Sequence, residues 1–294
     1  MSIANLVTAK NNLVDLEQLS FERNVLSLST SGGSIDRIVT VKFPKFVEAV
    51  NAFYDNLVKP KAIVSSAKEE SVVKNLRKRN VQYSDLKQFT MFCPPGMKVD
   101  FITFTNGLNS IVENVANIEK DLLETYNTFI GSLINDRSRF ETKRVNEHYT
   151  KIKLLDIEKL KKDLQKIVSK NEVSTVPYVK AVPNHSAWTD VVKVTNVMAE
   201  TLNKNSVERV YKALEDSKEL IATLSKIFDD VDLREEYEGI HATKFNKKLF
   251  AQIGDLTYNV AEAIEFYTVI VYLVESTAVA VNDNVAKINK TLLR

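Results

Sequence analysis

The feature that most constrains the fold is a run of apolar residues in which each member lies three or four positions after the last. The run consists of Phe101, Phe104, Leu108, Ile111, Val115, Ile118, Leu122, Tyr126, Phe129 and Leu133. Its alternating steps form a heptad seam, which is interrupted by one additional four-residue step, a stutter. The pattern predicts a helix over residues 99–135, about 55 Å long. Such a helix needs partner helices along its length, because helix propensity alone is a minor source of stability.

A second run of the same kind starts near Thr243 and continues to Leu292. It includes Tyr267, Ile270 and Val274 and predicts a helix of more than about 45 residues. The chain has 7 glycines and 6 prolines among 294 residues, well below the roughly 20 and 15 of average usage. Because turns depend on these residue types, the chain has room for few of them. We therefore predict an all-α fold, an elongated antiparallel helical bundle with long coiled-coil-like helices.

Two prolines and several polar residues interrupt the helical pattern between residues 171 and 188. We predict an N-terminal helical region at 1–171, a linker at 172–187 and a C-terminal helical region at 188–294. The second region is expected to pack on the first, and the two regions can also form one continuous bundle.

Four small residues carry local predictions. Gly107 and Gly131 lie inside the predicted helix at 99–135, where each costs about 1 kcal/mol relative to Ala. Close packing of a neighbouring helix would explain both glycines. Ser186 and Ser206 are the predicted N-caps of the two helices that follow the linker.

The segment TMFCPPGMKVDF contains Cys93, the only cysteine of the chain, which therefore forms no internal disulfide. A nucleophilic cysteine needs a lowered pKa and a nearby base. The three histidines are far from Cys93 in sequence, and the prolines that follow it remove two backbone donors. We predict a buried or loop thiol without a catalytic role. Pro94 and Pro95 are expected to end a short helix over 84–90, and Gly96 is expected to permit the turn before the long helix.

Candidate metal and phosphate motifs are incomplete. Glu238 and His241 have the i, i+3 spacing of di-iron bundles, but the required second pair is absent from the sequence. The acidic run at 229–239 lacks the glycine of a calcium loop, and residues 29–34 lack both Gly-rich phosphate patterns. The prediction is therefore no catalytic, cofactor-binding or metal-binding residues and no enzymatic activity.

Basic clusters predict at most weak contacts with nucleic acid. Lys74, Arg77, Lys78 and Arg79 are one cluster, and residues 151–170 are rich in lysine. Neither cluster has interleaved aromatic residues for base stacking, so solvated helix faces are the simpler interpretation. The net charge of +2 adds no strong overall field. The N-terminus lacks the apolar core of a signal peptide, so we expect an intracellular location, in a host cytoplasm, or a virion.

In overall texture, rich in Lys and Asn, low in Gly and without a motif, the chain resembles helical virion structural proteins of large tailed bacteriophages. The resemblance implies a component of a head, a tail or the particle interior. The leading hypothesis is a non-enzymatic structural protein that assembles with other subunits, of its own or another kind, by helix packing. Its predicted interaction seam comprises Phe101, Phe104, Leu108, Ile111, Val115, Ile118, Tyr126, Phe129, Tyr267, Ile270 and Val274.

Two other function classes remain open. The apolar residues 266–274 are too few to span a membrane, which takes about 20. A membrane-active protein of the pore-forming-toxin kind, with residues 264–281 as the apolar element, is nevertheless the alternative hypothesis. A helical-bundle enzyme is a third class, and it would need a metal or a cofactor.

Overall fold

The computed structural model describes residues 80–87, 89–135, 156–169, 175–229 and 246–292, together with 45, 47, 48, 50–52 and 76. Of the described residues, 83% are helical, so the predicted helical class is confirmed at this level. In chain order the elements are η3 (Tyr83–Leu86), β1 (Thr90–Phe92), α6 (Phe101–Val115), η4 (Glu119–Glu124), α7 (Thr125–Asn135), α9 (Ile157–Ile167), β2 (Thr175–Pro177), α10 (Tyr178–Ala181), α11 (His185–Thr201), α12 (Lys204–Asp229) and α14 (Asn246–Leu292).

α6, η4 and α7 follow one another as the long helical segment that the heptad seam predicts. The segment begins after Asp100, whose carboxylate accepts a hydrogen bond from the Thr103 amide at 2.9 Å, an N-cap. All ten seam residues between Phe101 and Leu133 are buried, with no more than 2% of any of them exposed. One side of the segment therefore faces the core along its whole length.

The stutter in the seam coincides with a π-helix. The additional four-residue step lies between Ile118 and Tyr126, and η4 occupies Glu119–Glu124 within that interval. A π-turn contains about one residue more than an α-turn. The eight-position step from Ile118 to Tyr126 therefore turns about as far as a seven-residue repeat, which keeps Leu122 and Tyr126 on the same buried side as Ile118.

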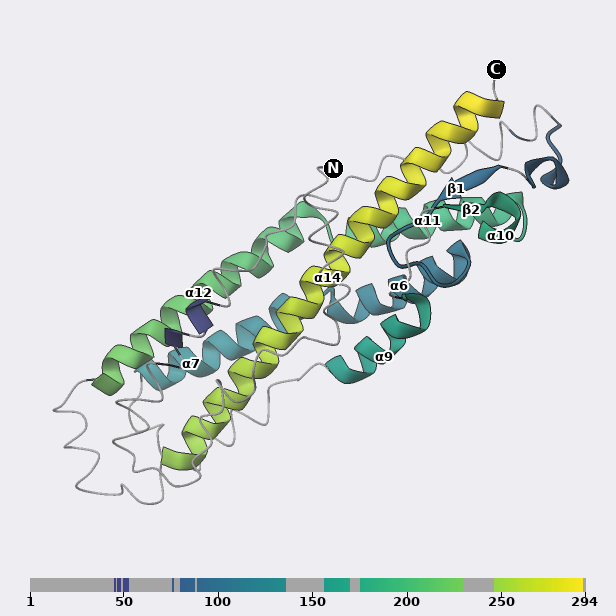
Figure 1. Ribbon diagram of the computed structural model, residues 1–294. Coiled ribbons are helices and arrows are strands. Elements are labelled where there is room, and N and C mark those ends of the chain that lie inside the picture. Colours follow the sequence, from purple (N-terminus) through teal and green to yellow (C-terminus); the bar gives the residue numbers. More distant parts are fainter. Residues whose placement is uncertain are drawn as a thin grey trace.

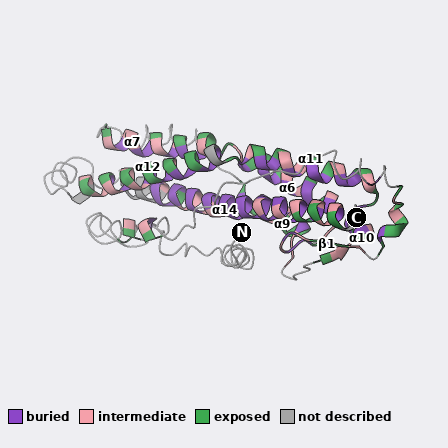
Figure 2. Ribbon diagram, turned by 90° about the horizontal axis from the view of Figure 1, so that it is seen from above, coloured by how far each residue is buried: buried purple, intermediate pink, exposed green. Residues whose placement is uncertain are grey.

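α14 is the longest described element, with 47 residues and a length of about 70 Å. It packs against α6, α9, α11 and β1, and Figure 1 shows it running past both the α6–α11 pair and the α7–α12 pair. From Val260 to Val281 no residue of α14 is exposed, as Figure 2 shows for its middle part. A helix that is apolar on all sides is stable in water only when it is covered on all sides.

Hydrogen bonds define the directions of the long helices. Phe92, just before α6, bonds to Asn284 near the end of α14, whereas Tyr126 in α7 bonds to Thr257 near its beginning. α14 therefore runs opposite to α6 and α7. α12 runs in the same direction as they do, because Arg209 bonds to Glu119 and Ser217 bonds to Asn127.

A small antiparallel sheet, which the sequence analysis missed, pairs β1 with β2, with Met91 opposite Val176. The predicted helix over 84–90 is wrong: its described residues form η3 and the start of β1. The physical reason is a tertiary contact. The fully buried side-chain amide of Asn284 accepts a hydrogen bond from the Phe92 amide at 2.7 Å and donates one to the Phe92 carbonyl at 2.8 Å. Pro94 and Pro95 therefore follow a strand.

The predicted turn and linker contain ordered backbone. Gly96 has a φ of +69°, and a Cβ there would lie 2.9 Å from the Ser169 carbonyl, so both the turn and the close approach require glycine. In the described part of the predicted linker at 172–187, β2 and α10 form, and Tyr178 and Ala181 are fully buried. This stretch packs into the core as well as connecting two regions.

Both predicted serine caps are wrong by a few residues. Asn184 caps α11, because its side-chain oxygen accepts from the Ala187 amide at 2.9 Å. Asn203 likewise caps α12, because its side-chain oxygen accepts a hydrogen bond from the Ser206 amide at 2.9 Å. Asn and Ser are both good N-caps, so the sequence pattern alone did not choose between neighbouring candidates.

Candidate functional site

The predicted interaction seam lies inside the chain. Its eight members between Phe101 and Phe129 are buried, and Tyr267, Ile270 and Val274 of α14 are 0% exposed. These side chains therefore already pack within one chain. Another subunit would reach them only if the helices separated, so contacts that leave the core intact have to use outer faces.

Polar pairs connect the helices within this apolar interior. The Tyr126 hydroxyl lies 2.8 Å from the Thr257 hydroxyl, and the Tyr211 hydroxyl lies 3.0 Å from the Thr268 hydroxyl. Ser217 donates to the side-chain oxygen of Asn127 at 2.6 Å. Burial raises the pKa of Tyr211 to about 12 and also raises that of Tyr126, so both remain neutral at physiological pH.

These pairs fix the register of α7, α12 and α14, because a one-residue shift would leave buried hydroxyls without partners. Sequence reasoning placed Tyr126 on the seam but gave no signal for its threonine partner. Thr257 and Thr268 fall outside the predicted apolar run of α14, and nothing in their spacing indicates that they face a tyrosine.

One lysine of the segment 151–170 is not part of a solvated face. Lys161 Nζ lies 2.6 Å from Glu262 Oε1, and the two side chains are only 12% and 14% exposed. The ion pair joins α9 to α14. Removing one partner would leave the charge of the other poorly solvated, so we expect the ion pair to fix the position of α9 against α14.

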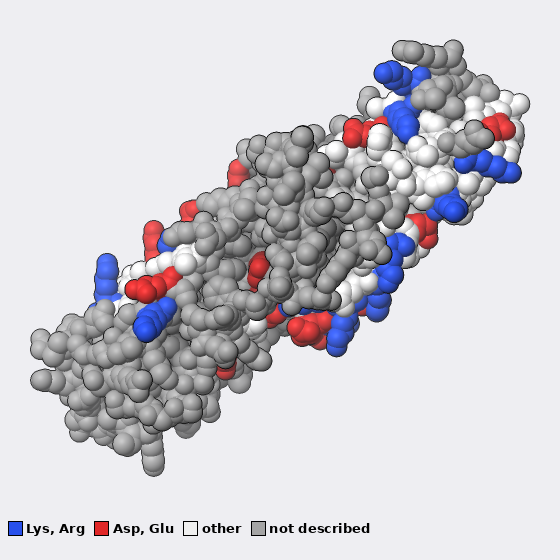
Figure 3. All heavy atoms as spheres, in the orientation of Figure 1, with Lys and Arg blue, Asp and Glu red and all other residues white. Residues whose placement is uncertain are grey.

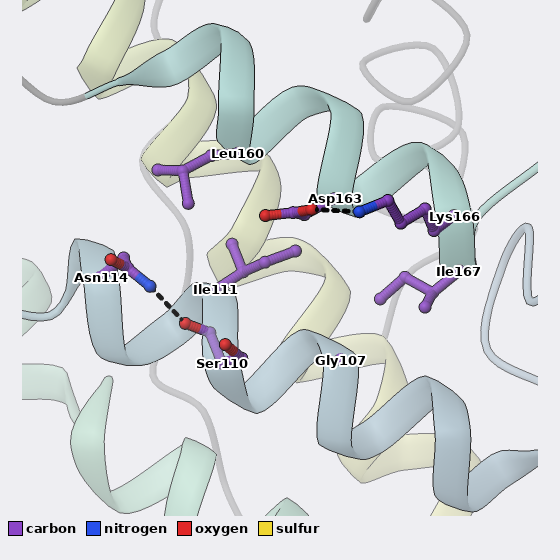
Figure 4. A pocket seen from close by; sticks show the side chains of 8 residues that line it. All are labelled: Gly107, Ser110, Ile111, Asn114, Leu160, Asp163, Lys166 and Ile167. Carbon is purple, nitrogen blue, oxygen red and sulfur yellow. Dashed lines mark hydrogen bonds and ion pairs between the residues drawn. The ribbon is translucent and has the colours of Figure 1, made fainter.

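The described surface has a groove between α6 and α9, with a volume of about 270 Å³. Figure 4 shows Ile111, Leu160 and Ile167 pointing into the space between the two helices. Its remaining lining residues are Gly107, Ser110, Asn114, Asp163 and Lys166. The helices approach closely at one end, because a Cβ on Gly107 would lie 2.9 Å from Ile167 Cγ2. This confirms the expected close packing at Gly107. At Gly131 the same expectation is wrong, because a Cβ there would lie 3.9 Å from Leu220 Cδ2, an ordinary van der Waals distance.

The rim of the groove is polar, and its charges are paired. Lys166 Nζ lies 2.7 Å from Asp163 Oδ1, and the hydrogen bond from this ammonium lowers the pKa of the Asp163 carboxyl. Asn114 donates to the Ser110 carbonyl at 2.7 Å. An apolar floor with a self-paired rim is suited to a small apolar group and offers no arrangement for acid–base chemistry.

An aromatic cluster holds the region before β1 against α10 and α11. His185 Nε2 lies 3.2 Å from the Val81 carbonyl, which can only accept, and His185 Nδ1 lies 3.0 Å from the Tyr178 hydroxyl. Both contacts are hydrogen bonds when Nε2 carries the proton and Tyr178 donates to Nδ1. The Tyr83 hydroxyl donates to the Val182 carbonyl at 2.6 Å. The cluster therefore has a structural role that the sequence did not indicate.

Cys93 is partly buried, and burial raises the pKa of its thiol to about 11. This is the opposite of the shift that a nucleophilic cysteine needs. Among the described positions no group of three or more His, Cys, Asp and Glu side chains could hold a metal ion. The predicted basic cluster (Lys74, Arg77, Lys78, Arg79), the Glu238–His241 pair and residues 29–34 lie outside the described residues.

Within the described part of the chain, one helical stretch, Gln252–Lys290, is long and apolar enough to cross a membrane. Of its most apolar window, 83% is buried inside the protein. The core helix of a water-soluble protein passes the same test of length and composition. Comparison of the chain with protein-family models, curated proteins and solved structures gave no match.

Proposed function

We propose that the chain is a non-enzymatic structural protein that works by helix packing as a component of a larger particle, such as the head, tail or interior of a phage virion. In this proposal its form is an elongated antiparallel bundle with coiled-coil-like helices. The observation that supports it best is α14, a continuous helix of 47 residues that packs against helices along its length.

In this proposal α14 acts as a spacer because of its length. At about 1.5 Å per residue the helix spans about 70 Å, and the Tyr126–Thr257 and Tyr211–Thr268 pairs fix its register with its neighbours. A helix of this length that is fixed along its sides holds two attachment points at a set separation, which is a common requirement in large assemblies.

The charge distribution favours protein partners over nucleic acid. Figure 3 shows Lys and Arg side chains interspersed with Asp and Glu over the described residues of the visible face. Nucleic-acid binding depends on several cations that neutralise phosphates together. Mixed charge of this kind suits contacts with other protein subunits, and any contact with nucleic acid would be weak and nonspecific.

Sedimentation equilibrium of the purified full-length chain, together with its fractionation alongside native particles, tests this proposal. We expect either a concentration-dependent multiple of the 33.3 kDa chain or a fixed copy number in a particle. A 33.3 kDa monomer at all concentrations that is absent from every particle fraction would refute it.

The membrane-active alternative rests on the apolar stretch of α14 alone. For residues 264–281 to insert into a bilayer, α14 would have to give up the Tyr211–Thr268 bond and leave its helical neighbours. Leakage of dye from anionic liposomes between pH 4 and pH 8 tests this alternative. Leakage that is stopped by a disulfide engineered between α14 and α11 would support it, and the absence of leakage at any pH would exclude it.

A further inference from the structure

Two of the three long helical segments of the described structure are interrupted within about two helical turns of each other, whereas the third, α14, continues past them without a break. In the first segment the π-helix η4 separates α6 from α7. In the second, α11 and α12 are separated at Leu202 and Asn203, where Leu202 has a φ of −100° and a ψ of 44°. In the third, α14, the helix is continuous, and the hydroxyl of Thr268 donates to the Ile264 carbonyl of the same helix at 2.9 Å.

Contacts between the segments place the two interruptions near each other and beside Thr268 of α14. α11 packs against α6, whereas α12 packs against η4 and α7, so the packing partner changes where both segments are interrupted. Arg209 in the second turn of α12 donates to Glu119 of η4 at 2.8 Å. Tyr211, one turn further on, bonds to Thr268 of α14 at 3.0 Å. Figure 1 shows the α6–α11 pair and the α7–α12 pair beside different halves of α14.

Both interruptions, and the Thr268 bond beside them, are of a kind that accompanies bends in helices. Sharp bends in helices occur at π-turns and where a side chain competes for backbone hydrogen bonds. Ser and Thr hydroxyls that bond to the carbonyl four residues earlier often bend a helix. Thr257 and Thr277 make the same bond elsewhere in α14, so the hydroxyl alone does not mark the level. The level is distinguished by the interruption of two neighbouring segments within about two turns of each other.

We propose that this level, formed by η4, Leu202–Asn203 and Thr268, is a hinge about which the half containing α6 and α11 bends relative to the half containing α7 and α12. α14 runs through the hinge and limits the bend. The proposal is independent of the particle in which the protein works.

The Glu119–Arg209 ion pair holds the hinge against the half that contains α12. It joins η4 directly to α12, and its side chains are 17% and 58% exposed, so it can open without exposing the core. The neighbouring hydroxyl of Tyr267 is buried and has no hydrogen-bond partner among the described residues. An unpaired buried hydroxyl disfavours the observed arrangement relative to one in which it finds an acceptor. The packing at the hinge is therefore less fully satisfied than at the Tyr126–Thr257 pair.

Distances between spin labels on the full-length chain test the hinge in a Cys93→Ser background. Labels at Lys193→Cys in α11 and Thr223→Cys in α12 lie on opposite sides of it, roughly 45 Å apart along the chain direction. Labels at Asn106→Cys in α6 and Lys193→Cys lie on one side and form the control. We expect a distance distribution across the hinge that is at least twice as wide as that of the control, and Arg209→Gln should widen it further.

Lys212→Gln, which removes an exposed cation one turn after Arg209, is the matched control for the change of charge. It should leave the distance distributions of both label pairs unchanged, and circular dichroism should show native helix content for every variant. Equal widths for the two label pairs, with no effect of Arg209→Gln, would overturn the hinge. Hydrogen exchange gives an independent check: amides at 118–125 and 202–207 should exchange at least tenfold faster than those of α6 and central α12, and equal rates would also overturn it.

Discussion

Two glycines on the first long segment offer a matched pair of substitutions, Gly131→Ala and Gly107→Ala. Both residues lie inside helices, where alanine is favoured over glycine by about 1 kcal/mol. At Gly131 a new Cβ would meet only Leu220 Cδ2 at 3.9 Å, an ordinary van der Waals contact. We therefore expect Gly131→Ala to raise the free energy of unfolding by about 1 kcal/mol.

At Gly107 the same methyl group has no room. It would lie 2.9 Å from Cγ2 and 3.3 Å from Cδ1 of Ile167, so α9 has to move or Ile167 has to change rotamer. Overpacking of this kind typically costs about 1–3 kcal/mol, which cancels or exceeds the propensity gain. We expect Gly107→Ala to lie between neutral and about 2 kcal/mol destabilising.

Urea denaturation followed by circular dichroism measures both variants, with unchanged m-values as the condition for comparing their free energies. In the double variant Gly107→Ala/Ile167→Ala the clash is absent, so the two substitutions should couple favourably by about 1 kcal/mol or more. Equal stabilisation by Gly107→Ala and Gly131→Ala, or the absence of coupling with Ile167→Ala, would refute the close contact between α6 and α9.

Three further predictions concern single groups. Burial raises the pKa of Cys93 to about 11. Iodoacetamide at pH 8 should therefore label the native thiol at least tenfold more slowly than the thiol of the urea-unfolded chain, and equal labelling rates would contradict this. Cys93→Ser should keep the native fold. Burial raises the pKa of Tyr211 to about 12. The contribution of this residue to stability is therefore complete below pH 10 and falls by up to about 3 kcal/mol as the pH rises towards 12, because this tyrosine ionises there only in the unfolded chain. Absorbance at 295 nm and helix content should therefore change together. Asn284→Ala should cost about 2–4 kcal/mol, because it leaves the Phe92 amide and carbonyl without their bonds, whereas the exposed neighbour Asp283→Ala should change unfolding by less than about 0.5 kcal/mol.

The long helices were predictable from sequence because their information is local and repetitive. A residue every three or four positions decides which side of a helix is buried, and Phe101 to Leu133 follow that rule throughout. The stutter also had a structural counterpart, since η4 lies within it. Its form as a π-helix was not predictable, because a stutter can also be accommodated by a change in supercoiling.

Features that depend on contacts across the chain were missed. Thr90 to Phe92 become a strand because Asn284, which lies 192 residues after Phe92, bonds to the backbone there. The Lys161–Glu262 ion pair and the tyrosine–threonine pairs likewise join residues that are far apart in sequence. The seam positions were identified correctly as apolar contacts, but their spacing does not say whether the partner helix belongs to the same chain.

The most direct test of the proposed function is gradient fractionation of particles from the native source, with the chain quantified by mass spectrometry in every fraction. We predict that the chain sediments with the particles at a fixed copy number and remains with them after a 1 M NaCl wash, because the contacts are helix packing and not surface charge. Recovery of all of the protein in the soluble fraction, as a 33.3 kDa monomer, would contradict its assignment as a structural component.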